Sequence, residues 1–176
     1  MERALLTVGH GPAGRARLGE LLTGAHVALV VDVRAFPASR TNPDVRREEL
    51  ERWLPRDGIA YRWEPRLGGR RHTPAGTPEP DTWWTVAAFR AYAAHTRTPD
   101  FRAALDEVLA DAAARTTAVM CSESVWWRCH RRLIADVAVL GHDVPVDHLM
   151  PDGRLTPHRP AAGARRLDGH DVIWDG

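Results

Sequence analysis

The segment from residue 121 to residue 132 carries the densest group of side chains that could do chemistry. It reads Cys-Ser-Glu-Ser-Val-Trp-Trp-Arg-Cys-His-Arg-Arg and follows a β-branched run that predicts a buried strand. A helix is predicted next, and its N-terminus favours negative charge because the helix dipole and free N–H groups point at the loop. Such a setting lowers the pKa of a thiol and makes it a nucleophile. We therefore predict that Cys121 is a catalytic nucleophile.

Two other predicted strands also end in polar residues. His10 follows the first strand, and Asp32 and Arg34 end the second. In open parallel sheets, ligands bind beyond the carboxyl ends of the strands. These side chains are therefore predicted to meet Cys121 at one edge of the sheet.

Arginines are predicted to bind an anion at this edge, because guanidinium groups hold phosphate, sulfate or carboxylate through paired hydrogen bonds. The three expected to do so are Arg34, Arg40 and Arg131. The other residues predicted to contact the substrate or anion are Ser39, Asn42, Arg70, Cys129 and His130.

Acid and base groups are available beside the predicted nucleophile. Glu123 or Asp32 would serve as the general base or as an orienting acid. His10 or His130 would carry a proton, because the pKa of imidazole lies close to neutral pH. We predict that Cys121, Glu123, Asp32 and His10 form the catalytic group.

Each of these roles has a structural alternative. Cys121 would then be an inert buried thiol, with Arg131 on a solvated helix face. Asp32 and Arg34 would form an ion pair that holds the strand ends together. His130 would be a neutral, hydrogen-bonded residue at the start of a helix.

A metal site is a further alternative, with Cys121, Cys129 and His130 among the conceivable ligands. The spacing of the two cysteines matches no zinc site, because such sites use pairs of the Cys-x-x-Cys type. We therefore predict no metal and no cofactor.

The elements that must position these residues alternate between strands and helices. Apolar runs predict strands near 4–8, 27–33, 59–63, 116–120 and 144–149. Helical spacing predicts helices near 18–24, 45–54, 81–95, 98–112 and 133–141. This alternation predicts one three-layer α/β domain, in which helices flank a mostly parallel sheet of about five strands.

Two segments show no clear period. Residues 64–80 are rich in Gly, Pro and Arg, and such a long loop is usually functional or disordered. Residues 159–176 are predicted to be an irregular C-terminal tail that follows a single α/β domain at 1–158.

A series of short motifs supports a family assignment. In order they are Thr-x-Gly-His at 7–10, Val-Asp-Val-Arg at 31–34, Ser-Arg-x-Asn-Pro at 39–43, Leu-Gly-Gly-Arg-Arg at 67–71, Cys-x-Glu at 121–123, Cys-His-Arg-Arg-Leu-Ile-Ala at 129–135 and His-Leu-x-Pro-Asp-Gly at 148–153. From about residue 4 to residue 158 the chain resembles the domain-of-unknown-function family 488. The resemblance implies a compact α/β domain with a shared polar pocket, but no defined reaction. Gly11 departs from the usual Ser, and Trp126-Trp127 replaces a short charged stretch.

The order strand, cysteine, loop, arginine and helix also resembles rhodanese and protein-tyrosine-phosphatase domains at the level of the fold. Those families close a shorter loop after the cysteine, whereas here the first arginine is Arg128 and Glu123 lies inside the loop. An acidic side chain in an anion site repels phosphate, which counts against a phosphatase.

Composition limits the function classes. The 176 residues are 44% hydrophobic and 27% charged, as in an ordinary globular chain. The net charge of +1 excludes the strongly basic balance of a general nucleic-acid binder. All 24 basic residues are Arg, so lysine-dependent chemistry is excluded. Two cysteines form no disulfide framework, and neither a signal-peptide pattern nor a membrane-spanning run occurs, so we expect a cytoplasmic protein without a membrane partner.

We therefore predict an enzyme that acts on a small anionic substrate, a nucleotide or a sulfur compound, by cysteine-dependent hydrolysis or transfer. The alternative is a nucleic-acid-binding or repair-associated module, whose arginines contact phosphates and whose tryptophans stack on unpaired bases of a single strand. Trp126-Trp127 and Trp83-Trp84 would supply that stacking, or would simply fill the core. A sensor that binds the ligand without turnover would share the same pocket.

Overall fold

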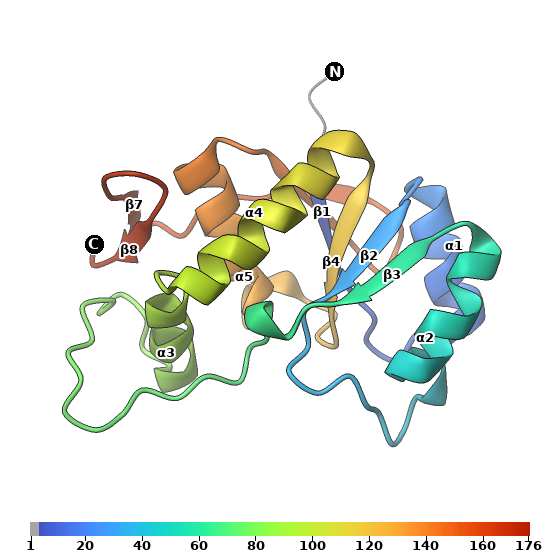
Figure 1. The fold of residues 1–176 in the computed structure, drawn as a ribbon, viewed down its shortest axis with the longest axis horizontal. Coiled ribbons are helices and arrows are strands. Elements are labelled where there is room, and N and C mark those ends of the chain that lie inside the picture. Colours follow the sequence, from blue (N-terminus) through green and yellow to red (C-terminus); the bar gives the residue numbers. More distant parts are fainter. Residues whose placement is uncertain (1–3) are drawn as a thin grey trace.

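Six strands form one sheet in the order β3-β2-β4-β1-β5-β6 (Figure 1). The computed structural model describes residues 4–176. The strands from β3 to β5 run parallel, and β6 pairs antiparallel with β5 at the edge. The strands are β1 (Leu5–Gly9), β2 (Leu29–Asp32), β3 (Ala60–Trp63), β4 (Thr117–Cys121), β5 (Val146–Leu149) and β6 (Leu155–Pro157).

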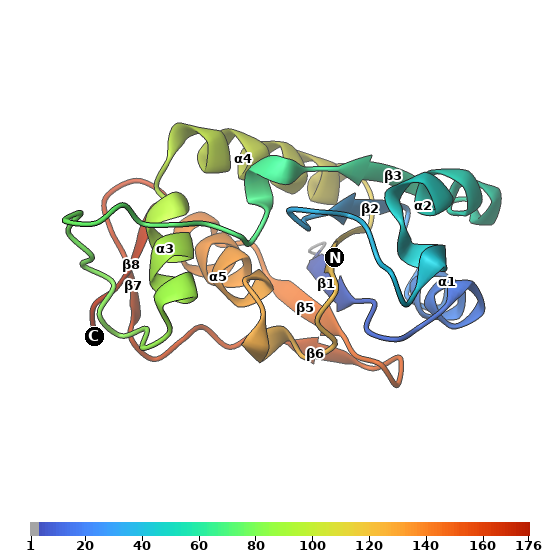
Figure 2. The ribbon, with the colours of Figure 1, turned by 90° about the horizontal axis from the view of Figure 1, so that it is seen from below.

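Helices cover both faces of this sheet. They are α1 (Arg15–Gly24), α2 (Arg47–Trp53), α3 (Ala87–His95), α4 (Pro99–Ala114) and α5 (Arg131–Asp136), which continues as a π-helix at Val137–Gly141. Figures 1 and 2 show α1 and α2 on one side of the molecule and α3, α4 and α5 on the other. The predicted α/β domain with a mostly parallel sheet flanked by helices is confirmed.

The two faces of the sheet bury different residues, because successive side chains of a strand point to opposite sides. Val30 and Met120 pack with the residues of α1 and α2. Val31 and Cys121 pack with the residues of α3, α4 and α5. The sulfur of Cys121 is therefore on the α5 side of the sheet.

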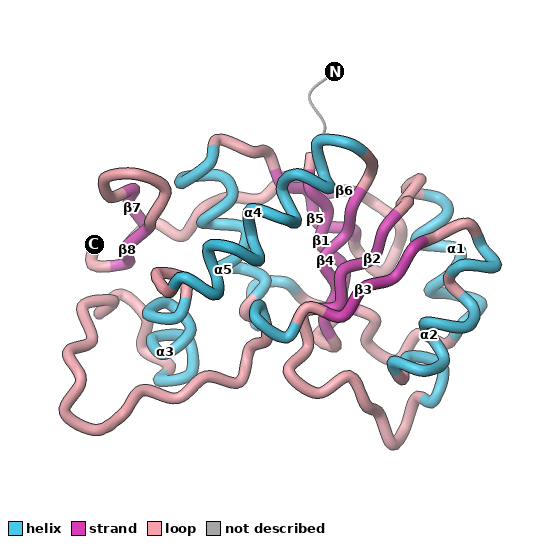
Figure 3. The backbone as a smooth tube through the Cα atoms, viewed as in Figure 1, coloured by secondary structure: helices cyan, strands magenta, loops and turns pink. Residues whose placement is uncertain are grey.

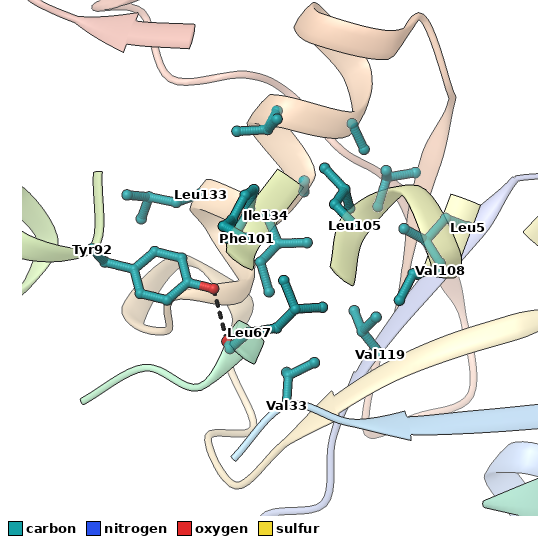
Figure 4. Packing of buried hydrophobic residues seen from close by; sticks show 14 of the residues in the cluster. Leu5, Val33, Leu67, Tyr92, Phe101, Leu105, Val108, Val119, Leu133 and Ile134 are labelled. Carbon is teal, nitrogen blue, oxygen red and sulfur yellow. Dashed lines mark hydrogen bonds between the residues drawn. The ribbon is translucent and has the colours of Figure 1, made fainter. Parts of the chain in front are cut away.

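The larger hydrophobic cluster also fixes the loop after β3. Figure 4 shows Leu67 and Tyr92 among buried side chains of α4, α5 and the strands. The hydroxyl of Tyr92 donates a hydrogen bond to the carbonyl of Leu67 at 2.8 Å. This contact holds the glycine-rich segment that follows Leu67 beside the carboxyl end of β2, where Gly68 packs on Ala35.

The carboxyl ends of β1, β2 and β4 meet through backbone hydrogen bonds. The amide of His10 donates to the carbonyl of Cys121 at 3.0 Å, and the amide of Gly11 donates to Ser122 at 2.9 Å. The amide of Val33 donates to Met120 at 2.9 Å. Polar residues that lie far apart in the sequence are thus brought to one edge of the sheet.

The helix predicted near 81–95 begins only at Ala87. Residues before it are held by tertiary contacts instead, because the buried carboxylate of Asp81 accepts hydrogen bonds from Arg97 and from the backbone of Trp174. Within residues 4–176, every helix is too short or too polar to span a bilayer.

The C-terminal residues differ from the irregular tail predicted at 159–176. Two short strands, β7 (Ala164–Arg166) and β8 (Val172–Trp174), form an antiparallel hairpin apart from the main sheet (Figure 3). Three-residue strands are too short to show an alternating pattern in the sequence. Burial of Trp174, whose indole N–H donates to Asp136 at 2.8 Å, holds the hairpin against α5. The domain boundary after residue 158 stays a prediction.

Candidate functional site

A cavity of about 370 Å³ opens where the carboxyl ends of β1, β2 and β4 meet. Phe36 and Phe89 give it an apolar wall. The predicted site residues that line it are His10, Arg34, Ser39, Arg70, Cys121, Glu123, Cys129 and His130. Distant stretches of the chain therefore form one hollow with sulfur atoms in its wall.

The two cysteines of the chain lie against each other in this cavity. Cys121 ends β4, and Cys129 directly precedes the residues that start α5. Their Sγ atoms are 2.7 Å apart, and both thiols are free. Cys121 is 3% exposed and Cys129 is 6% exposed, so both sulfurs are largely screened from water.

Arg131 lies beneath the sulfurs rather than in the cavity. Its Nε donates to Cys121 Sγ at 3.0 Å, and its terminal nitrogens donate to Thr7 Oγ1 at 3.0 Å and to the carbonyl of Glu123 at 2.6 Å. Gly9 makes room for this packing, because a Cβ there would lie 1.7 Å from the Glu123 carbonyl oxygen. With 1% of its surface exposed, Arg131 does not reach a ligand as the predicted anion fork.

His130 connects a thiol to the backbone of the second strand. Its Nε2 lies 3.0 Å from the carbonyl of Val33, and a carbonyl only accepts, so Nε2 carries a proton. Nδ1 faces Cys129 Sγ at 3.5 Å. Gly69 allows this position, since a Cβ there would lie 2.5 Å from Nδ1. The ring is thus oriented with one nitrogen toward sulfur.

Burial opposes ionisation of both thiols, but their pKa values move in opposite directions. At Cys129, hydrogen bonds to Cys121 and His130 and the charges of His130 and Arg131 outweigh burial, so the pKa lies well below the ordinary thiol value. At Cys121, burial acts together with the hydrogen bond to Cys129 and the charge of that sulfur, so the pKa is raised. The lowered thiol pKa predicted for Cys121 is therefore found at Cys129 instead.

Asp32 and Arg34 form a buried ion pair, which is the structural role given above as the alternative to a catalytic or anion-binding one. Arg34 donates to both carboxylate oxygens of Asp32, at 2.8 and 2.7 Å, and the hydroxyl of Tyr61 donates to the same carboxylate at 2.6 Å. The Asp32 side chain is fully buried. Asp32 also pairs in register with Met120, so it points to the face opposite Cys121. It is not placed to act as a general base on a ligand near the sulfurs.

His10 lines the cavity as a neutral ring. Its Nδ1 lies 2.8 Å from the carbonyl of Gly11 and carries a proton, while its Nε2 accepts from Arg34 at 3.3 Å. Burial is the main cause that lowers the pKa of His10, and the positive charge of Arg34 adds to it. His10 therefore has no free nitrogen directed at the sulfurs.

The remaining predicted residues divide between the cavity rim and the loop behind it. Arg70 is exposed on the rim, with its guanidinium 5.2 Å from the centre of the Phe36 ring. Glu123 is exposed, and its carboxylate accepts from the amide of Val125 at 3.4 Å. Ser39 Oγ accepts from the amide of Asn42 at 3.0 Å, which closes the loop. Among the described residues, neither Asn42 nor the exposed Arg40 lines the cavity.

Arg128 is a cavity residue to which sequence reasoning assigned no role. It is exposed at the end of the 3-10 helix Trp126–Arg128 and lines the cavity beside Cys129. The only sequence signal for it was its place between the two cysteines. Arg128 and Arg70 thus replace Arg40 and Arg131 as the guanidinium groups that reach the cavity together with Arg34.

A buried chain of polar side chains connects Arg131, at the start of α5, with Asp136 at its end. Thr7 Oγ1 lies 2.6 Å from His148 Nδ1, His148 Nε2 lies 2.8 Å from His158 Nδ1, and His158 Nε2 lies 2.6 Å from Asp136 Oδ1. Burial is the main cause that lowers the pKa of His148 to about 2, and the charges of His158 and Arg131 contribute. Every polar side chain in this series has a hydrogen-bond partner, from Arg131 at one end to the carboxylate of Asp136 at the other.

The tryptophans are used mainly in packing. Trp126 stacks on His148, with ring centres 4.2 Å apart and planes 3° from parallel. Trp84 is buried beside Trp174, and the guanidinium of Arg132 lies 5.0 Å from the Trp84 ring centre. Trp127 is the exception, since 45% of its surface is exposed.

Comparison with known proteins identifies a family. The family model described as "Domain of unknown function DUF488" matches residues 15–138, which is more than half of the chain. Searches of curated proteins and of solved structures returned no match. The matched region contains both cysteines, His130 and the rim arginines described above. The chain therefore belongs to the DUF488 family.

Proposed function

We propose that this protein is a cysteine-dependent enzyme that hydrolyses or transfers a group of a small anionic substrate, with Cys129 as the attacking sulfur. The observation that carries the proposal is the arrangement Cys129, His130 and the Val33 carbonyl at the wall of an open cavity. A nucleophile, a base within reach and a third group that orients the base is the general pattern of nucleophilic catalysis.

The position of one proton supports this assignment. Because Nε2 of His130 donates to Val33, Nδ1 is the nitrogen that can accept the proton of Cys129. The thiolate left behind accepts hydrogen bonds from the Cys121 S–H and from the amide of Arg131 at 3.4 Å. Each of these contacts favours the charged form of sulfur. Cys121, with its raised pKa, serves as a donor to the nucleophile in this proposal.

The substrate is expected to carry negative charge. Arg70 and Arg128 stand exposed on the rim, whereas the charge of Arg34 in the wall is balanced by Asp32. Guanidinium groups in a shared concavity attract small anions and raise their local concentration. A nucleotide or an anionic sulfur compound fits a cavity of about 370 Å³.

Alkylation kinetics test the proposal. At neutral pH, Cys129 should react with iodoacetamide about tenfold faster than free cysteine, because full ionisation outweighs the lower nucleophilicity of a low-pKa thiolate. Negatively charged iodoacetate should gain a further advantage of about tenfold relative to free cysteine. The double variant Arg70→Gln and Arg128→Gln should lose that preference. Arg40→Gln, an exposed arginine outside the cavity, is the matched control and should keep it.

Cys129→Ser should abolish rapid alkylation, whereas Cys121→Ser should retain a reactive thiol. Peptide mapping of the labelled residue distinguishes these cases. A chain that reacts only as fast as free cysteine, or is labelled at Cys121 in preference to Cys129, would refute the proposed role of Cys129.

A second candidate function is a module that binds single-stranded nucleic acid. One observation favours it: Phe36 is 66% exposed and Trp127 is 45% exposed, and each adjoins a rim arginine. Exposed rings beside arginines suit stacking on unpaired bases. Binding of an oligonucleotide that weakens steeply with salt, and that Trp127→Ala reduces, would favour this function over the first.

A further inference from the structure

The contact between the sulfurs of Cys121 and Cys129 allows a covalent bond as well as a hydrogen bond. The two Sγ atoms are 2.7 Å apart, so a small change in side-chain torsion would bring them to the bonding distance of about 2.05 Å. Cys121 is the last residue of β4, and Cys129 lies two residues before α5. A partly exposed loop connects them. The chain has only these two cysteines, so no third thiol competes for either sulfur.

We propose that the pair reduces hydroperoxides, with Cys129 as the sulfur that is oxidised and Cys121 as the sulfur that resolves it to a disulfide. The inference rests on the reactive thiolate of the proposed function and adds an activity of its own. Its substrate class is hydrogen peroxide or a small organic hydroperoxide, and its electron donor is a small thiol.

In the first step the thiolate of Cys129 attacks one peroxide oxygen and the O–O bond breaks. The leaving oxygen takes the proton that His130 Nδ1 had received from Cys129, and water or an alcohol departs. Cys129 is oxidised to the sulfenic acid, and the peroxide is reduced. The pocket supplies access for a reagent of this size, because both sulfurs line it.

In the second step Cys121 attacks the sulfur of the sulfenic acid. The S–S bond forms, the S–O bond breaks, and the departing hydroxide takes the proton of Cys121 to give water. Arg131 Nε, 3.0 Å from Cys121 Sγ, stabilises the thiolate that this attack requires. Two molecules of a small thiol then reduce the disulfide and are themselves joined as a disulfide, which restores both cysteines.

The geometry separates this proposal from ordinary overoxidation. A sulfenic acid without a neighbouring thiol persists or proceeds to the sulfinic acid. Here the second sulfur is already in contact, and its own raised pKa keeps it protonated until Cys129 has reacted. The disulfide should therefore be the main product.

Intact mass and thiol counting test the inference. The fully reduced protein is mixed with one equivalent of hydrogen peroxide. We expect it to lose two hydrogen atoms and both titratable thiols, about tenfold faster than free cysteine is oxidised. Dithiothreitol should restore both thiols. A wild-type product that gains oxygen without a disulfide, or that stays reduced while free cysteine is oxidised, would overturn the proposal.

Two variants assign the roles of the sulfurs. Cys121→Ser should stop at a sulfenic acid that dimedone labels at residue 129. Cys129→Ser should react no faster than free cysteine. Circular dichroism checks that each variant is folded. Dimedone labelling at residue 121 in Cys129→Ser at the wild-type rate would reverse the assignment and so refute it.

The outcomes also separate this inference from the proposed function. Rapid alkylation of Cys129 together with slow peroxide oxidation would leave the proposed function standing and reject the peroxide activity. Slow alkylation and slow oxidation together would reject both.

Discussion

Two buried arginines stand at the same end of the sheet, and they are held in different ways. Arg34 forms a bidentate ion pair with the carboxylate of Asp32. Arg131 contacts a thiol sulfur, a hydroxyl and a carbonyl, and no ion pair found within residues 4–176 includes it. A guanidinium beside a carboxylate has its charge balanced locally, whereas one beside neutral groups acts on whatever can ionise nearby. Arg34 therefore supports the fold, and Arg131 acts on the sulfurs.

The pairing of β2 with β4 explains why Asp32, the partner of Arg34, and Cys121, the partner of Arg131, lie on opposite faces of the sheet. Asp32 lies opposite Met120, and both point toward α1 and α2. Cys121 is one residue further along β4 and points to the other face. One residue of register therefore separates a buried structural carboxylate from a sulfur at the cavity.

The largest expected effect is the loss of the ion pair. Arg34→Met should lower the free energy of unfolding by about 3–5 kcal/mol, because it leaves the carboxylate of Asp32 buried without its cation. Urea unfolding measures the change. Arg40→Met removes an exposed arginine and should change stability by less than about 0.5 kcal/mol. Equal effects of the two substitutions would contradict the structural role of Arg34.

The contrasting substitution is Arg131→Met. It should raise the apparent pKa of the reacting thiol, because the cation beside the sulfur pair is lost. The rate of iodoacetamide alkylation as a function of pH measures this value. Arg34→Met, if folded, should leave the profile in place. An unchanged profile in Arg131→Met would show that this arginine, too, is purely structural.

The buried histidine chain predicts a pH dependence of stability. The pKa of His148 is about 2 in the folded chain and about 6.5 when unfolded, so between these two pH values only the unfolded chain binds this proton. Stability should therefore fall with decreasing pH, by at most about 1.4 kcal/mol per pH unit from this group. Urea unfolding between about pH 6 and pH 4 measures the slope. In His148→Gln the free energy of unfolding should depend less steeply on pH, because the contribution of one proton is lost. An equal slope in both proteins would contradict the low pKa of His148.

The smallest predicted effect concerns His130. Gly69→Ala should displace the imidazole, because the added Cβ would lie 2.5 Å from Nδ1. We expect alkylation of Cys129 to slow by about threefold, which corresponds to about 0.7 kcal/mol in the barrier, because the ring turns away from the sulfur. Gly24→Ala is the control, since its Cβ would meet no atom within 4 Å. A rate unchanged by Gly69→Ala would argue against His130 as the base.

Much of this edge could be predicted from the sequence. The β-branched run before Cys121 and the helical pattern after it fixed the strand, loop and helix that carry both cysteines. Parallel strands bring their carboxyl ends together, which is why His10 and Arg34 were expected near Cys121 and do line the same cavity.

The chemistry of the individual groups could not be predicted in the same way. Which thiol ionises depends on contacts that close only when the loop folds back and Cys129 meets Cys121 and His130. The buried chain through His148 and His158 joins β5 to the residue that directly follows β6, and β6 is too short to be recognised in the sequence. Sequence spacing carries no information about such hydrogen bonds.

The C-terminal hairpin has a consequence for engineering. Trp174 of β8 donates to Asp136, which holds His158 and, through it, the polar series that ends at Arg131. Truncating the chain near β8, or fusing a tag there, would therefore disturb the hydrogen bonds that lead to Arg131. The thiol reactivity measured with such a protein would differ from that of the intact chain.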